Sequence, residues 1–422
     1  MIQLRQEGSF APLNPGERLL QLDAIRGCAL LGVLLMNVHY HFRGPAMLYV
    51  LDAHPSPGLV DALVDDLLRF FVEGKAMTLF CMLFAVGLAI QLERYEARGG
   101  KRFWAFAWRR MGALFAIGLL HVVLLWEGDI LAVYALAGVL LFPFLRRKPR
   151  TVYIWTASLF GLLAAMVVAM LVVRMLRGGV RPPSARAAAA AAEMVARSLE
   201  VHGQGSWWDV LLFRAEEWRQ NLWGQLPALL DAFASSMLGL AVWRSGIPRD
   251  PLSRGTALRG AAGWLTGAGL AAGVVALYWK PIRACALAHA PWGLALAIPA
   301  GLCAEFGAKV LALGYGALLL LAWQTPKGRL LLGPFAWAGR LALTNYLAQS
   351  LIMTAIFYGW GLGLFGKVGP AAGLALGVLV FGLQAWVSRR WLGRFLFGPA
   401  EWLWRCLSYG RFQPFRLDGA AR

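Results

Sequence analysis

The chain has 422 residues, of which 59% are apolar and 15% are charged, and its mean hydropathy is +0.58. A soluble protein of this size carries less apolar and more charged surface, so the composition excludes a soluble enzyme and indicates a polytopic membrane protein. The formal net charge is +19, but Lys and Arg occur in short clusters between apolar runs. We interpret these clusters as topology signals and expect no nucleic-acid partner.

The polar N-terminus is followed by the first of a series of apolar runs that approach the roughly 20 residues needed to cross a bilayer. No small-x-small cleavage pattern follows the first run, which predicts a retained span. The runs cover residues 25–42, 74–92, 108–126, 130–145, 151–173, 226–243, 260–279, 304–323, 335–358 and 370–388. The sequence therefore predicts an all-α membrane protein of about ten transmembrane helices.

Basic residues set the expected orientation. The cluster Arg146, Arg147, Lys148 lies on the same side as the N-terminus, whereas the turn with Glu127 and Asp129 on the other side is acidic. Positive charge stays in the cytoplasm, so both termini are predicted to be cytoplasmic. We expect one integral domain: a cytoplasmic segment 1–24, five helices in 25–173, an extracytoplasmic loop 174–225, five helices in 226–388 and a basic amphipathic tail 389–422.

The loop 174–225 contains an alanine run and several tryptophans, among them Trp207 and Trp208. Tryptophan anchors helices at the headgroup level, so one or two interfacial helices are expected on the outer face. A tether without a function is an equally good interpretation. The tail 389–422 has Trp and Phe among arginines, which predicts a helix on the anionic inner surface.

Polar residues within the spans are the main functional signal, because a charge near the bilayer centre costs at least ~3 kcal/mol and normally faces a cavity or a substrate path. In the first span, Asp23 and Arg26 lie at the inner edge and Asn37 lies eleven residues beyond Arg26. The eleven residues correspond to about 16 Å of helix. Arg26 could hold a phosphate and Asn37 could orient a carbonyl, or the residues could form only a surface pair and an interhelical hydrogen bond.

In the third span, His121 lies in an apolar run that is followed by Glu127 and Asp129. A carboxylate that reaches back to His121 would fix the imidazole tautomer and support general-base catalysis. Packing of a neutral histidine and an N-cap role for Asp129 explain the same residues without catalysis.

The ninth span places Asn345 and Gln349 four residues apart on one helical face, after Arg340. These amides either line an interior or form interhelical hydrogen bonds. Arg340 is expected near Arg26, Arg109 and Arg110, and four guanidiniums at one end of a bundle suit a polyphosphate or lipid headgroups.

Glu305 and Lys309 interrupt the eighth span, and they could line a substrate path or carry a coupling proton in a transporter. His39, His41 and His54 follow the first span, with no carboxylate or cysteine at ligand spacing. We therefore expect no metal site.

The stretches LDAIRGCALLGVLLMNV, GKAMTLFCMLFAVGL, GLLHVVLLWEGDILAVY, GRLALTNYLAQSLI and GPAEWLWR follow one another between residues 22 and 405. This order of motifs resembles the YeiB-type family of bacterial inner-membrane proteins. The resemblance implies a multi-pass protein of the bacterial inner membrane but names no reaction.

A more distant resemblance is to bacterial membrane O-acyltransferases and to heparan-alpha-glucosaminide N-acetyltransferase. It implies an acyl-CoA co-substrate and a catalytic Asn37 paired with His54, with His121 as the rival base. The expected function is transfer of an acyl group from cytoplasmic acyl-CoA to a hydroxyl or amine of an extracytoplasmic small-molecule, glycan or lipid acceptor. The alternatives are a transporter or lipid-handling permease, and a scaffold without turnover. The expected partners are membrane lipids, and the oligomeric state, including a homo-oligomer, stays open.

Overall fold

A computed structural model of the protein describes residues 19–46, 48, 58–99, 102–177, 184–220, 224–279, 282, 285 and 292–417. Within these ranges the regular elements are helices, and one isolated bridge joins Phe395 to Arg416. The helices are α1 (Leu20–Asn37), η2 (Val38–Phe42), α3 (Leu59–Phe71), α4 (Lys75–Ala97), α5 (Phe103–Leu124), α6 (Leu131–Leu141), η3 (Phe142–Phe144), α7 (Pro149–Leu176), α8 (Ala185–Gln204), α9 (Trp207–Gln220), α10 (Gln225–Arg244), α11 (Gly255–Leu277), α13 (Trp292–Trp323), α14 (Pro326–Arg340), α15 (Ala342–Phe357), α16 (Pro370–Leu392) and α17 (Pro399–Tyr409).

Eight stretches of the described chain are long and apolar enough to cross a membrane, and two shorter apolar helices, Leu131–Phe144 and Ala342–Phe357, accompany them. The ten predicted runs coincide with these segments. The structure thus confirms an all-α polytopic membrane protein.

Two features of the helices differ from the prediction. The expected single helix over 335–358 is interrupted at Leu341, where α14 ends and α15 begins, and the backbone of Leu341 leaves the helical region at φ −111° and ψ 34°. An additional helix, α3, precedes the second predicted span and is separated from α4 by a turn in which Gly74 has φ +75°. A left-handed residue ends a helix sharply, and glycine adopts that conformation without a steric penalty.

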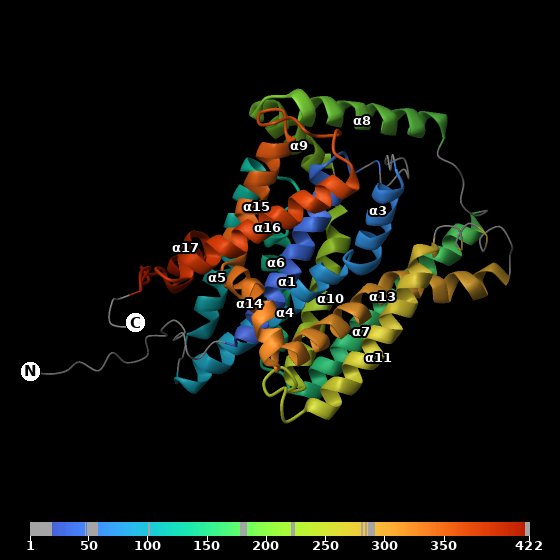
Figure 1. Ribbon diagram of the computed structural model, residues 1–422. Coiled ribbons are helices and arrows are strands. Elements are labelled where there is room, and N and C mark those ends of the chain that lie inside the picture. Colours follow the sequence, from blue (N-terminus) through green and yellow to red (C-terminus); the bar gives the residue numbers. More distant parts are fainter. Residues whose placement is uncertain are drawn as a thin grey trace, which may run out of the picture.

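The centre of the bundle is α1, which packs against α4 and α14 (Figure 1). α1 and α14 approach so closely that a Cβ on Gly27 would lie 1.9 Å from the carbonyl oxygen of Phe335, and one on Gly339 would lie 1.9 Å from that of Asp23. Only glycine permits this approach. It brings Arg26 and Arg340 to the same end of the bundle.

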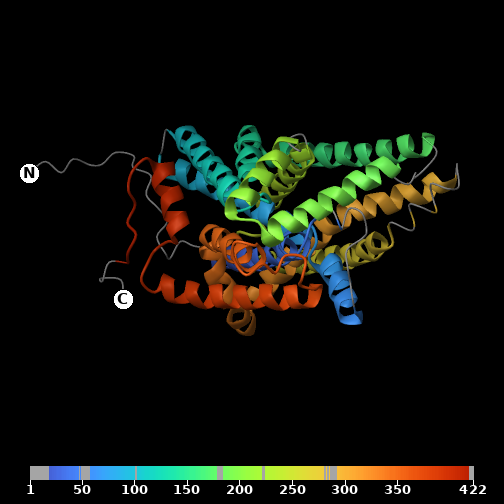
Figure 2. The same cartoon turned by 90° about the horizontal axis from the view of Figure 1, so that it is seen from above.

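Helices α7, α11 and α13 form a second layer that extends to one side (Figures 1 and 2). α11 packs against α13 through further small residues, such as Gly269 against Leu311 and Gly314 against Thr266. Trp264 on α11 is 83% exposed. An apolar exterior of this kind suits lipid contact.

Helices α8 and α9 occupy the segment in which we expected interfacial helices, and α8 crosses the top of the bundle in Figure 1. The amide of Gly359, just after α15, donates to the carbonyl of His202 at 2.7 Å, which fixes α8 to the bundle. In the C-terminal tail, α17 packs against α5 instead of lying apart from the helices, and the indole N–H of Trp404 donates to the carbonyl of Arg110 at 2.8 Å.

Candidate functional site

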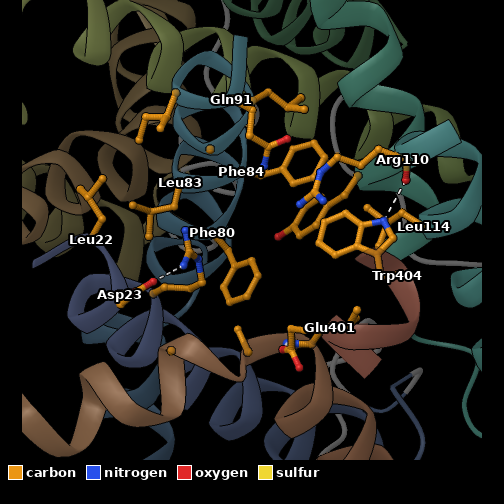
Figure 3. A pocket seen from close by; sticks show the side chains of 18 of the residues that line it. Leu22, Asp23, Phe80, Leu83, Phe84, Gln91, Arg110, Leu114, Glu401 and Trp404 are labelled. Carbon is orange, nitrogen blue, oxygen red and sulfur yellow. Dashed lines mark hydrogen bonds and ion pairs between the residues drawn. The ribbon is translucent and has the colours of Figure 1, made fainter. Parts of the chain in front are cut away.

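A cavity of about 250 Å³ lies between α1, α4, α5, α6, α14, α15 and α17 (Figure 3). It is at the end of the bundle that carries the N-terminus of α1, which the charge distribution predicts to be cytoplasmic. Six guanidinium side chains line it, and they far outnumber the carboxylates of Asp23 and Glu401. The arginines are Arg26, Arg94, Arg98, Arg110, Arg340 and Arg405.

Arg26 is held by an ion pair within α1. Its Nη1 lies 2.5 Å from Oδ1 of Asp23, which is 6% exposed. The pair is one helical turn apart, so it orients the guanidinium along the helix surface. Figure 3 shows the pair at the cavity wall, near Phe80.

Arg110 is stacked on the indole of Trp404, with its Cζ 3.5 Å from the ring centroid. A cation over an aromatic face is attracted by the ring quadrupole, and the stack fixes the guanidinium plane. The neighbouring Arg109 is exposed, does not belong to the cavity lining, and donates through Nε to the carbonyl of Ser408 at 3.1 Å. Of the four arginines proposed from the sequence, Arg109 is the one the structure leaves outside.

Arg340 reaches the cavity because the helix breaks directly after it. Glu401 of α17 stabilises the break: Oε1 accepts from the amides of Leu343 at 2.7 Å and Thr344 at 3.1 Å, and Oε2 accepts from the Thr344 hydroxyl at 2.5 Å. A carboxylate suits the unpaired N–H groups at the N-terminus of α15. Burial raises the pKa of Glu401, and these hydrogen bonds oppose that shift.

Away from the arginines, the cavity wall becomes apolar and aromatic. Phe80, Phe84, Leu114 and Leu131 line this part, together with Tyr134 and Tyr346. The phenyl ring of Phe84 stacks on Tyr134 at 5.7 Å between centroids. The cavity thus changes from cationic to apolar along the bundle.

His121 and Asp129 form a buried pair beside this apolar part. Nδ1 of His121 lies 2.9 Å from Oδ1 of Asp129, and both side chains are 0% exposed. Oδ2 of Asp129 also accepts from the amide of Ala132 at 2.8 Å. The imidazole of His121 lies 5.2 Å from the ring of Tyr346, which lines the cavity.

The carboxylate fixes the histidine tautomer. A proton on Nδ1 donates to Asp129, which leaves Nε2 as the acceptor nitrogen. Nε2 is buried and has no hydrogen-bond partner in the described part of the chain. An oriented imidazole with a free, unprotonated nitrogen is the arrangement that general-base catalysis requires.

Comparison of the amino-acid sequence with known proteins identifies the family of the chain. Residues 242–411 match the model of a protein of unknown function, DUF418. The chain is 31% identical to the uncharacterized protein YxaH of Bacillus subtilis (strain 168), over 96% of this chain and 98% of YxaH. It is also 31% identical to the uncharacterized protein YeiB of Escherichia coli (strain K12), over 93% of this chain and 96% of YeiB.

The chain belongs to the YeiB family. The membership predicted from the motif order is thereby confirmed. The DUF418 match contains the broken helix and α17, so nine of the 28 residues that line the arginine cavity, including Arg340, Glu401 and Trp404, come from the part of the chain that defines this domain.

Two predicted lining residues of this YeiB-family chain lie elsewhere. Asn345 donates through Nδ2 to the carbonyl of Ala338 at 3.0 Å and to Oγ of Ser388 at 3.1 Å. Gln349 donates to Oε1 of Gln384 at 2.8 Å, and Gln384 donates to the carbonyl of Asn345 at 3.0 Å. Neither amide lines the cavity, so the interhelical alternative is correct for both.

The other predicted residues that the structure describes, Asn37, Glu127 and Glu305, also do not line the cavity. Asn37 is half-buried at the end of α1, and His54 lies outside the described residues. Glu305 lies 3.7 Å from Nζ of Lys309, which contacts Asp231 of α10 at 2.6 Å. Glu127 faces the hydroxyl of Tyr358 at the outer end of the bundle.

His39 pairs with Asp65 of α3 through Nε2 at 2.9 Å. Among the described residues, no group of three His, Cys, Asp or Glu side chains has the geometry to hold a metal ion.

Sequence reasoning missed half of the arginines and the side chains that position them. The basic cluster with Arg94 and Arg98 predicts only topology, Arg405 belongs to the predicted amphipathic tail, and Glu401 is not among the predicted site residues. A carboxylate in the otherwise aromatic and basic stretch GPAEWLWR was the one available signal.

Proposed function

We propose that this YeiB-family protein is a transmembrane acyltransferase. The arginine cavity would take an acyl-CoA, and the acyl group would pass to a hydroxyl or amine of an acceptor on the opposite side. The observation that carries the proposal is a cavity with six guanidiniums at one end and Tyr346 at the other, where the ring of Tyr346 lies 5.2 Å from that of the buried His121, which pairs with Asp129.

The charge of the cavity supports a polyphosphate ligand. Arginine forms bidentate hydrogen bonds to phosphate, and several guanidiniums in a site of low dielectric repel one another unless an anion balances them. Arg26 has an acidic partner and Arg110 an aromatic one. The excess positive charge is the feature that a diphosphate would neutralise.

The length of the site supports a donor with a flexible arm. Arg110 and His121 lie on the same helix, eleven residues apart. Eleven residues correspond to about 16 Å and to about three full turns, so both side chains leave the same face of α5. An acyl-CoA has this construction, since its phosphates are separated from the thioester by the pantetheine arm.

The buried pair supplies the proton chemistry. Nε2 of His121 takes the proton of the acceptor hydroxyl or amine as its oxygen or nitrogen attacks the thioester carbonyl, and Asp129 stabilises the resulting imidazolium. When the carbon–sulfur bond of the tetrahedral intermediate breaks, the imidazolium returns the proton to the leaving thiolate. Asn37 stays a prediction as the oxyanion donor, because the described contacts of His121 are with Asp129, Trp126 and Tyr346.

The test uses the intact protein in membrane vesicles of known orientation. Acetyl-CoA labelled on the acetyl group is added on the cytoplasmic side, and protein-dependent transfer of label to glycan or lipid is measured. Transfer that requires His121, together with saturable CoA binding that requires Arg110, supports the proposal. Absence of both binding and transfer in folded protein contradicts it.

A transporter is the second candidate, favoured by one observation. Lys309 and the half-exposed carboxylates of Asp231 and Glu305 form a charged triad between α10 and α13, outside the cavity lining. Ionisable groups within spans often serve proton-coupled transport. Substrate flux in proteoliposomes that is lost in Glu305→Gln, without any acyl-CoA binding, would favour this candidate.

A further inference from the structure

A second group of polar side chains, some buried and some half-buried, belongs to the opposite end of the bundle, over which α8 and α9 lie in Figure 1. We call it the outer cluster. Its members come from four separate parts of the chain: the turn after α5, α8, α9 and the residue that follows α15. They are Glu127, His202, Arg214, Glu217 and Tyr358.

His202 provides an unpartnered nitrogen in an aromatic surround. The residue is 3% exposed, and Nδ1 lies 3.0 Å from the carbonyl of Ser198. Its ring lies within 5.3 Å of the rings of Phe213, Tyr358 and Phe365, measured between centroids. Nε2 is buried and hydrogen-bonds to no group among the residues that the structure describes.

Arg214 is a second buried group with unused hydrogen-bonding capacity. It is 3% exposed, and its Nε donates to the carbonyl of Val210 at 3.2 Å. Nη1 has no partner in the described ranges. The Arg214 charge acts on both Tyr358 and His202, so the guanidinium lies near both side chains.

The charges of the outer cluster are close to balanced. Burial raises the pKa of Glu217 to about 7, and the Glu127 carboxylate adds to the shift. Burial lowers the pKa of His202, so its imidazole is neutral near pH 7. Arg214 and Arg197, whose charge also acts on Glu217, then oppose Glu127 and a partly protonated Glu217. The outer cluster differs in this from the arginine cavity, where positive charge is in excess.

The turn between α5 and α6 joins the outer cluster to the proposed base. Glu127 belongs to the cluster, and Asp129, two residues later, holds His121. The indole of Trp126 lies 6.3 Å from the ring of His121 and 5.5 Å from that of His41, between centroids. A molecule bound in the outer cluster would therefore lie on the outer side of His121.

We propose that the outer cluster binds the acceptor, and that the acceptor is a neutral, polyhydroxylated molecule of the sugar type. Burying a polar group without a partner is unfavourable, so several such groups close together mark a place where polar ligand atoms complete the hydrogen bonds. Hydroxyl groups both donate and accept, which suits a carboxylate, an imidazole and a guanidinium at the same time. The aromatic rings around His202 offer apolar faces for the C–H side of a sugar ring.

The charges of the outer cluster favour a neutral acceptor over a cationic or an anionic one. An ammonium group would meet Arg214, and a phosphate or carboxylate group would meet Glu127 in a site of low dielectric, where like charges repel strongly. A neutral polyol meets neither obstacle. The inference rests on the proposed function, since it assigns the acceptor side of the same reaction.

The experiment measures sugar binding without the acyl donor. Full-length protein in lipid nanodiscs is titrated with methyl glucoside, glucosamine and glucose 1-phosphate, and binding is followed by saturation-transfer NMR. In a second arm the nanodisc contains a glucosyl-diacylglycerol, and retention of that lipid is measured by native mass spectrometry. Binding in the first arm indicates a free sugar, and binding in the second alone indicates a lipid-linked one.

Matched variants on α9 provide the control. Arg214→Gln is expected to weaken binding of the neutral sugar at least tenfold, and Glu127→Gln to do the same. Arg219→Gln, on the exposed side where Arg219 pairs with Glu216 at 2.7 Å, should leave it unchanged. CoA binding and a monodisperse elution profile must be retained in all three variants.

Three results would overturn the inference: no saturable sugar binding in either arm, tighter binding of glucosamine or glucose 1-phosphate than of the neutral sugar, or equal loss in Arg214→Gln and Arg219→Gln. CoA binding in the same preparations separates this failure from that of the proposed function. If CoA binds and its acyl group is transferred while neutral sugars fail, the acyltransferase stands and the acceptor assignment falls.

Discussion

The arginine cavity and the amide network between α15 and α16 both contain polar side chains from apolar segments of the chain. Arg340 of the cavity and Asn345 of the network are close neighbours in the sequence. In the network, the amides of Asn345, Gln349 and Gln384 donate to protein acceptors on the facing helix or backbone. In the cavity, guanidiniums exceed the carboxylates that face them. The difference indicates that polar residues of spans mark a binding site where like charges gather around a cavity, and mark helix packing where amides bond to one another across two helices.

The largest effect is expected at His121. His121→Gln keeps a hydrogen-bonding side chain but removes the base, so transfer from labelled acetyl-CoA should fall by about 10²–10⁴-fold, the usual contribution of general acid–base catalysis. CoA affinity should stay unchanged, because the arginines are untouched. Transfer at the wild-type rate in this variant would exclude the His121–Asp129 pair from the chemistry.

A smaller effect is expected at Arg110, which lines the cavity, and the adjacent Arg109 serves as the matched control. Arg110→Gln should weaken CoA binding by about 10- to 100-fold, since a charge-assisted hydrogen bond contributes about 1.5–3 kcal/mol. Arg109→Gln should leave binding unchanged, because Arg109 lies outside the lining. Calorimetric titration of both variants at two salt concentrations makes the comparison, and equal losses would place the phosphates elsewhere.

Removal of the Glu401 carboxylate should destabilise the break between α14 and α15. Glu401→Ala removes the acceptor of two backbone amides, and loss of such a cap costs about 0.5–2 kcal/mol. We expect a lower thermal-unfolding midpoint and weaker CoA binding, because the cap positions Arg340. Glu96→Ala, which removes only an exposed ion pair with Arg146, is the control. A stable Glu401→Ala protein with unchanged CoA affinity would show that the cap does not position the cavity.

The smallest effect is expected in the amide network. Gln349→Leu and Gln384→Leu form a double-mutant cycle whose coupling free energy should be near ~0.6 kcal/mol, typical of hydrogen bonds between membrane helices. Unfolding in mixed micelles measures it. Acyl transfer per folded protein should not change. A loss of activity without a loss of stability would indicate that Gln349 belongs to the functional site.

Local sequence was sufficient to predict the spans, because about 20 consecutive apolar residues leave few alternatives to a membrane helix. It also offered the pairing of His121 with a following carboxylate as one of two interpretations, since the two residues flank one tight turn. It could not choose between interior and interhelical roles for Asn345, because that choice depends on Ser388 of another helix, 43 residues away.

Sequence by itself determined an all-α membrane protein, the asymmetry of its basic residues and the chemical types of the polar groups that lie within its spans. These properties follow from composition and local periodicity, which do not depend on contacts between distant segments. The tertiary structure decided the interruption at Leu341, the return of α17 to α5, and which arginines share a cavity. Those features depend on contacts between distant segments, such as Glu401 with Thr344 and Gly339 with Asp23, and no local pattern encodes a partner that lies on another helix.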